Sequence, residues 1–157
     1  MKKRFLSLLL VLVLIMSLMP AALAVNADDA QPKTISVTFR LHTDTDEWIA
    51  PTEVSDLPEG TSVFTVFQKV LADKGYTYEY HEQYCYVQAI TAPDGTRLAE
   101  FSKGKNSGWL FRVNNDFADV GMNDFVLMDG DEIEVLYTAD YAKEPGMSLP
   151  YTDVSWD

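Results

Sequence analysis

The chain has a single cysteine, few basic residues and only one long apolar run. A lone cysteine excludes an internal disulfide, so packing must stabilise the fold, and Cys85 is interpreted as a small buried apolar residue. The shortage of Lys and Arg leaves a formal net charge of −12. That charge disfavours contact with phosphate backbones and anionic headgroups, so nucleic acid is not an expected partner.

The apolar run lies at the N-terminus and has the order of a secretory signal. Basic residues 2–4 precede 15 positions from Phe5 to Met19, and a small-residue cleavage site ends at Ala24. The run is shorter than the roughly 20 residues that a membrane-spanning helix needs. We therefore expect residues 1–24 to be a signal peptide, with no membrane insertion after its cleavage, and the mature protein to be extracellular, either free or associated with the cell surface.

Cleavage makes the protein more acidic. The signal holds three of the 12 basic residues and no acidic one, so the remaining 133 residues carry 9 Lys and Arg against 24 Asp and Glu, a net charge of −15. That length is typical of one domain with a sizeable core. We expect a flexible leader over residues 25–33, a folded domain over 34–140 and a tail over 141–157.

Period-two alternation predicts several strands. Ile35, Val37, Phe39 and Leu41 alternate with polar residues, which indicates a strand with one buried face. The acidic segment from Thr43 to Pro51 breaks the alternation and is predicted to be a loop. Further strands are expected at 76–80, 84–90, 109–113 and 132–137, with a short segment at 98–101.

One helix is expected between them. Thr61 or Ser62 can cap its start, apolar residues recur at helical spacing from Val63 to Leu71, and Lys74 with Gly75 is typical of a helix end. One helix among five or more short strands predicts the α+β class.

The C-terminal half carries a series of short motifs. They are a Gly108-Trp109 strand start, the turn Val113-Asn114-Asn115, then Gly121, and Asp129-Gly130-Asp131 leading into the last strand. Together with Leu57-Pro58-Glu59-Gly60 before the helix, this order resembles the transcobalamin-like C-terminal domain family, over residues 35–138. Asn115 stands where that family commonly has glycine, and Asn also tolerates the left-handed angles of a tight hairpin.

The resemblance implies a β-grasp-like domain, a mixed sheet of about five strands packed on one helix. It also implies a corrinoid, of the cobalamin type, as a candidate ligand. The vitamin B12 carriers of this family supply half of their pocket from a helical domain, for which this chain has no room. A corrinoid would therefore need a partner to complete its site.

Four aromatic or polar residues are the candidate ligand contacts: Trp109, Asn114, Phe117 and Tyr86. Trp109 either stacks on a flat ligand or belongs to the core, because it shares one strand face with Phe111 and Val113. Tyrosines 76, 78, 80, 84 and 86 share one parity, which is typical either of an aromatic platform or of the half-buried face of paired strands. Trp48, within an acidic segment, is the indole expected to be exposed.

Enzyme and metal signatures are weak in this sequence. Two acidic clusters, around Asp44 to Glu47 and Asp129 to Glu132, lack the register of a calcium loop, and His42 and His81 lack the spacing of a zinc site. Carboxylates such as Glu79 and Glu134 could do acid–base work, but no spacing in the sequence suggests that two of them converge. We therefore expect no catalytic residues, no metal site and no resident cofactor.

Two functions remain open. The first is a secreted, non-catalytic module that binds a small molecule, with cobalamin as the candidate. The second is a protein-interaction module that joins another surface protein through strand edges or an acidic face.

Overall fold

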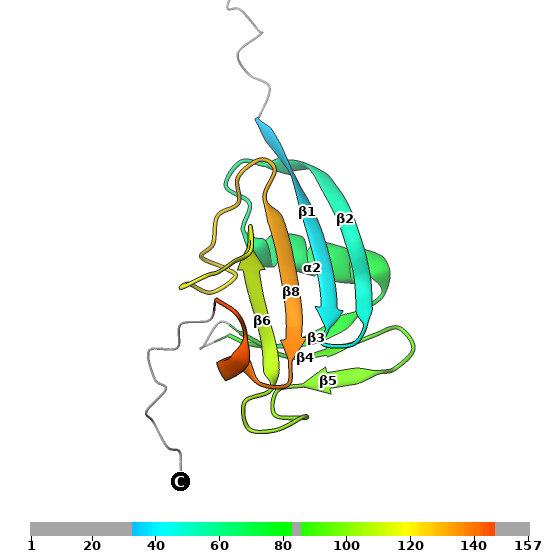
Figure 1. Cartoon of the computed structure of the whole chain (residues 1–157). Coiled ribbons are helices and arrows are strands. Elements are labelled where there is room, and N and C mark those ends of the chain that lie inside the picture. The colour runs from blue at the N-terminus through cyan, green and yellow to red at the C-terminus, as the bar shows by residue number, and fades with distance from the viewer. Residues whose placement is uncertain (1–32, 83–85, 147–157) are drawn as a thin grey trace, which may run out of the picture. The chain divides into compact units, whose positions relative to one another are not determined.

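The computed structural model describes residues 33–82 and 86–146, which belong to one compact unit of helix and sheet (Figure 1). The predicted α+β class is confirmed. The expectations for the signal peptide and for Cys85, and most of those for the leader and tail, fall outside the described residues. In chain order the elements are β1 (Thr34–Thr43), β2 (Glu47–Pro58), α2 (Val63–Lys74), β3 (Thr77–His81), β4 (Tyr86–Thr91), β5 (Arg97–Ala99), β6 (Gly108–Val113), β7 (Asp116–Phe117), β8 (Glu132–Thr138) and the 3-10 helix η2 (Tyr141–Lys143).

The larger sheet has five strands in the order β2-β1-β8-β6-β7. β1 and β8 are parallel, whereas the other neighbouring pairs are antiparallel. The predicted mixed sheet of about five strands is therefore confirmed. Its one parallel pair joins the first strand of the domain to the last, so the sheet is complete only when these distant segments meet.

A smaller antiparallel sheet, β3-β4-β5, crosses the lower end of the larger one in Figure 1. Its strands were predicted, but their separation into a second sheet was not. Two side chains tie the sheets together: Trp109 Nε1 donates to the Leu98 carbonyl at 3.0 Å, and the Tyr137 hydroxyl donates to the Ala99 carbonyl at 2.8 Å.

Helix α2 lies behind the larger sheet in Figure 1 and closes one hydrophobic core. Ser62 caps its start by accepting a hydrogen bond from the Thr65 amide, and Gly75 ends it with a φ of 77°, as predicted. Among the described residues, no helix is long and apolar enough to cross a membrane. The side chains that α2 buries are Val63, Val66, Phe67, Val70 and Leu71.

Strand β2 shows that the loop prediction for the acidic segment from Thr43 to Pro51 was wrong. The predicted acidic loop is mostly strand, since β2 begins at Glu47. Pro51 is tolerated because β2 is an edge strand, where an outward amide needs no partner. Register shifts against β1 and a left-handed Asp56 (φ 58°) interrupt the alternation that would have revealed the strand.

The turn between β6 and β7 agrees with its prediction. Asn114 and Asn115 have φ values of 53° and 72°, and both lie in the left-handed region. A two-residue hairpin turn of this type needs positive φ at both positions, which asparagine accepts more readily than most residues. The hairpin therefore forms without the family's glycine.

A substitution at Phe39 tests how much the hydrophobic core contributes to the stability of the fold. The Phe39 side chain is fully buried on the central strand β1, so Phe39→Ala should lower the free energy of unfolding by about 3–5 kcal/mol. Phe101→Ala is the matched control, because Phe101 is 61% exposed and its loss should cost less than about 0.5 kcal/mol. Urea unfolding followed by circular dichroism measures both, and equal losses would contradict this description of the core.

Candidate functional site

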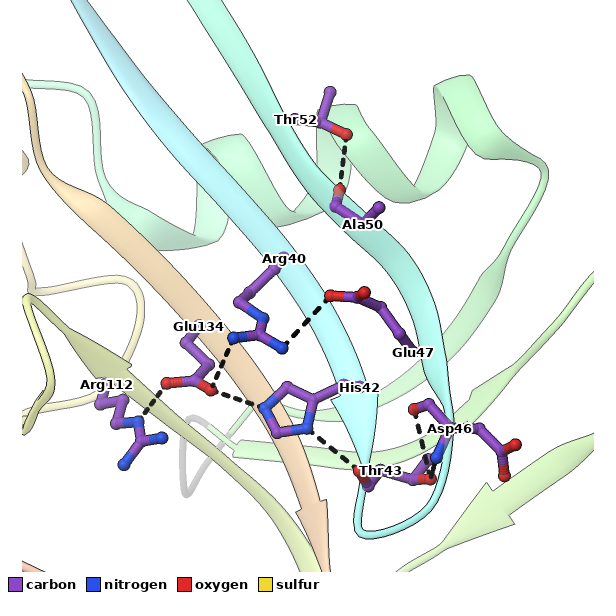
Figure 2. A network of polar contacts seen from close by, with 9 residues as sticks. All are labelled: Arg40, His42, Thr43, Asp46, Glu47, Ala50, Thr52, Arg112 and Glu134. Atoms are coloured by element: carbon purple, nitrogen blue, oxygen red, sulfur yellow. Dashed lines mark hydrogen bonds and ion pairs between the residues drawn. The ribbon is translucent and has the colours of Figure 1, made fainter.

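The face of the larger sheet that points away from α2 carries a polar network, shown in Figure 2. Residues 35, 37, 39 and 41 of β1 are buried, so Arg40 and His42 point to the opposite side. The strand registers place Arg40 of β1 beside Glu134 of β8, and Glu134 beside Arg112 of β6. We call this surface the outer face.

Glu134 is the centre of the network. Its Oε1 lies 2.6 Å from His42 Nε2 and 3.7 Å from an Arg40 amino nitrogen, and its Oε2 accepts from Arg112 Nε. Burial raises the pKa of Glu134, but the hydrogen bonds from Arg112 and His42 outweigh it, so the pKa lies below its ordinary value. The same bond to Glu134 raises the pKa of Arg112.

Both ring nitrogens of His42 face acceptors. Nε2 meets the Glu134 carboxylate, and Nδ1 lies 3.0 Å from the Thr43 carbonyl oxygen. Which of the two nitrogens donates depends on the tautomer of the ring. Glu134 thus has two guanidinium groups, those of Arg40 and Arg112, and the His42 ring as neighbours.

The network continues to both edges of the sheet. Arg40 contacts Glu47 of β2 at 3.2 Å, and the Arg112 guanidinium lies 5.7 Å from the centroid of the Phe117 ring on β7. One row of side chains therefore crosses all five strands. We call it the five-strand row, and its members are Glu47, Arg40, Glu134, Arg112 and Phe117.

A groove of about 560 Å³ lies beside this row, between the ends of β1 and β8 and the helix η2. Leu136 is an apolar wall residue, buried to 4% exposure, and the charged groups around it have both signs. Lys143 pairs with Asp140 at 2.8 Å, and hydrogen bonds from Lys143 and Asn106 lower the pKa of Asp140. Other groove residues are His42, Asp44, Arg112 and Glu144.

Two of the predicted contacts meet at the β6–β7 hairpin. Asn114 donates from Nδ2 to Asp131 at 2.8 Å and accepts from the Glu132 amide at 3.0 Å, so its side chain fastens the hairpin to β8. Phe117 is half-buried beside Arg112. Of these two, Phe117 has the side chain that borders the outer face.

The other two predicted contacts lie elsewhere. Trp109 is the second residue of β6, about 16 Å of strand from Asn114 at ~3.3 Å per residue. It is 7% exposed, and its ring packs 5.1 Å from that of Tyr137, which is the placement of the core alternative. Tyr86 lies on β4 in the smaller sheet and stacks on His81. A role of these side chains in binding remains a prediction.

The structure corrects the prediction for Trp48. Its indole was expected to be exposed, but it is half-buried, with ring centroids 6.0 Å from Tyr76 and 5.6 Å from Trp109. The carbonyl of Trp48 also accepts from the Tyr76 hydroxyl at 2.7 Å. The acidic neighbours of Trp48 therefore gave a misleading indication of exposure.

Sequence reasoning missed Arg40, His42 and Arg112. The alternation in β1 already placed Arg40 and His42 on the side opposite the core residues. The alternation could not predict that β1 pairs with β8 in parallel. This pairing places Glu134 beside His42, although the two are 92 residues apart in sequence.

The structure also shows where the acidic clusters and the two candidate acid–base carboxylates lie. In residues 33–82 and 86–146, no group of three or more His, Cys, Asp or Glu side chains is placed to hold a metal ion. Asp129 and Asp131 instead accept hydrogen bonds from the amides of Ser36 and Met128 in a turn. Glu79 is bound to Arg97 in the smaller sheet, so it does not converge with Glu134.

Comparisons with known proteins give one family match and structural likenesses. The model of a family described as a domain of unknown function, DUF4430, matches residues 60–139, which is half of the chain. No curated protein sequence matches.

The solved structures to which this chain is similar include the following two. Haptocorrin in complex with Cbi is 19% identical with a TM-score of 0.48, over 68% of this chain and 25% of that chain. A candidate metal-binding protein from Ruminococcus gnavus ATCC 29149 is 17% identical with a TM-score of 0.44, over 66% of this chain and 95% of that chain. This chain thus spans about a quarter of the length of haptocorrin.

Glu134→Gln tests the centre of the outer face. The amide cannot neutralise the surrounding cations, so the free energy of unfolding at neutral pH should fall by about 1–3 kcal/mol. The folded pKa of Glu134 is lowered, so its stabilisation is complete above its unfolded pKa of about 4.3 and disappears as pH falls through the folded value. Urea unfolding should therefore show a smaller difference between wild type and variant at about pH 3 than at neutral pH.

The matched control is Glu47→Gln, at the exposed end of the same row, where the side chain is 44% exposed. It should change stability by less than about 1 kcal/mol. A Glu134→Gln effect that is independent of pH would show that shape, not charge, holds the network.

Proposed function

The chain belongs to the DUF4430 family, a domain of unknown function, and we propose that it is an exported, non-catalytic module that binds a small ligand on its outer face. The observation that carries this proposal is the groove beside the five-strand row. Its volume of about 560 Å³ falls within the roughly 300–1,000 Å³ of small-molecule sites. The network around Glu134 fixes the positions of the polar side chains at the border of the groove before a ligand binds.

A corrinoid is the proposed ligand class. The motif order of residues 35–138 resembles transcobalamin-like C-terminal domains, and a corrin carries neutral amide side chains around a largely apolar ring. The groove is lined by the buried Leu136, by donors such as Arg112 and by acceptors such as Asp44. Because the groove is open, it covers one side of a ligand, and a partner would supply the other. Residues 1–24 support the proposed export.

Titration of the mature protein with cobalamin tests this function, read by equilibrium dialysis and by tryptophan fluorescence corrected for cobalamin absorbance. We expect saturable binding below millimolar concentration. Phe117→Ala should weaken it roughly threefold to tenfold, since it removes an aromatic surface beside Arg112. Phe101→Ala, an exposed phenylalanine on another loop, should leave it unchanged. If the protein neither bound cobalamin nor changed its corrected tryptophan fluorescence at millimolar cobalamin, the corrinoid would be ruled out as the ligand.

A second function is favoured by an exposed apolar segment. Three residues between β7 and β8 have large exposed fractions: Val120 (43%), Val126 (57%) and Met128 (73%). The three lie within one stretch of nine residues, and exposed apolar groups that gather on a monomer's surface are a feature of protein contact sites. This segment supports the proposal of an interaction module that joins another cell-surface protein.

Met128→Asp tests the second function. A charge at this position should abolish capture of a defined surface protein by immobilised mature protein, and the loss should be repeated with the purified partner. Phe101→Asp is the matched control, because it adds the same charge at another exposed apolar position. Capture that both variants lose equally would point to general electrostatic repulsion.

A further inference from the structure

A second groove, of about 540 Å³, opens between α2 and β3 on the helix side of the larger sheet. It has no part in the outer face, and the proposed function does not use it. Its lining residues are Phe64, Gln68, Tyr78, Tyr80, Glu82 and Asn123.

Helix and strand periodicity build this groove. Phe64 and Gln68 are four residues apart on α2, so they share one flank of the helix, beside the buried stripe. Tyr78 and Tyr80 are two residues apart on β3 and share one face of that strand. The groove therefore has one wall from each element, with one aromatic ring from α2 and two from β3.

Contacts between the walls fix the rings. The Phe64 centroid lies 4.4 Å from that of Tyr80 and 6.0 Å from that of Tyr78, the latter edge to face. Gln68 Nε2 donates to the Tyr78 hydroxyl at 2.6 Å. All three rings remain half-buried rather than buried, so each keeps some surface toward solvent.

The polar groups define what this surface can accept. The amides of Gln68 and Asn123 and the carboxylate of Glu82 are exposed at the groove. An apolar ligand would desolvate these groups without replacing their hydrogen bonds. An anionic ligand would meet Glu82 in a chain of net charge −12.

A neutral sugar satisfies both conditions, because its C–H face packs on aromatic rings while its hydroxyls bind amides and carboxylates. We propose that the α2–β3 groove binds a neutral oligosaccharide. The volume of the groove, about 540 Å³, is that of a small-molecule site. This site is independent of the corrinoid proposal, and either can fail alone.

NMR titration of the mature protein with cellotetraose and chitotetraose tests the site. We expect at least one of them, at millimolar concentration, to shift resonances of Phe64, Gln68 and Tyr78 and to receive saturation transfer from the aromatic protons. Tyr78→Ala should raise Kd roughly threefold to tenfold by removing a stacking surface. Gln68→Ala keeps every ring and should raise Kd about threefold by removing a hydrogen-bonding group.

The controls distinguish binding in this groove from nonspecific binding to exposed aromatic rings. Phe101→Ala removes an exposed ring outside the groove and should leave Kd unchanged. Gln68 is exposed, so Gln68→Ala reports on the site even if Tyr78→Ala does not fold. No binding of either sugar at millimolar concentration, shifts outside the groove, or equal Kd values for wild type and Gln68→Ala would each overturn the proposal.

Discussion

The parallel pairing of β1 with β8 is the constraint on which the outer face depends. It sets Arg40 against Glu134 and places His42 within hydrogen-bond distance of the same carboxylate. Without that register Glu134 would be a half-buried carboxylate with fewer compensating cations, a costly state. The same pairing brings the first and last strands together under the hydrophobic core, so site and fold share one long-range contact.

Local signals were sufficient for much of this fold. Helix α2 was predicted with its cap and end because Ser62 and Gly75 lie next to the residues that they cap. Strands β1, β6 and β8 were predicted because each alternates on its own. Strand β2 was missed because its bulges and Pro51 are tolerable only at a sheet edge, and edge position is a property of the assembled sheet.

The candidate site was less predictable for the same reason. Asn114 and Phe117 are three residues apart, and their hairpin was predicted from local turn chemistry. The network around Glu134 joins β1, β6 and β8, and no spacing in the sequence states which strands are adjacent. Trp109 was left open between a ligand contact and a core position, and in the structure its indole N–H donates to the Leu98 carbonyl between the two sheets.

The alternation of charge along the five-strand row has a consequence for encounter with ligands. Glu47 and Glu134 are set against Arg40 and Arg112, so the charges of this row cancel in a chain of net charge −12. The field of the whole molecule repels anions at long range, but it falls off over about 8 Å at physiological ionic strength. A neutral ligand would thus reach the outer face by unsteered diffusion, at a rate that added salt barely alters.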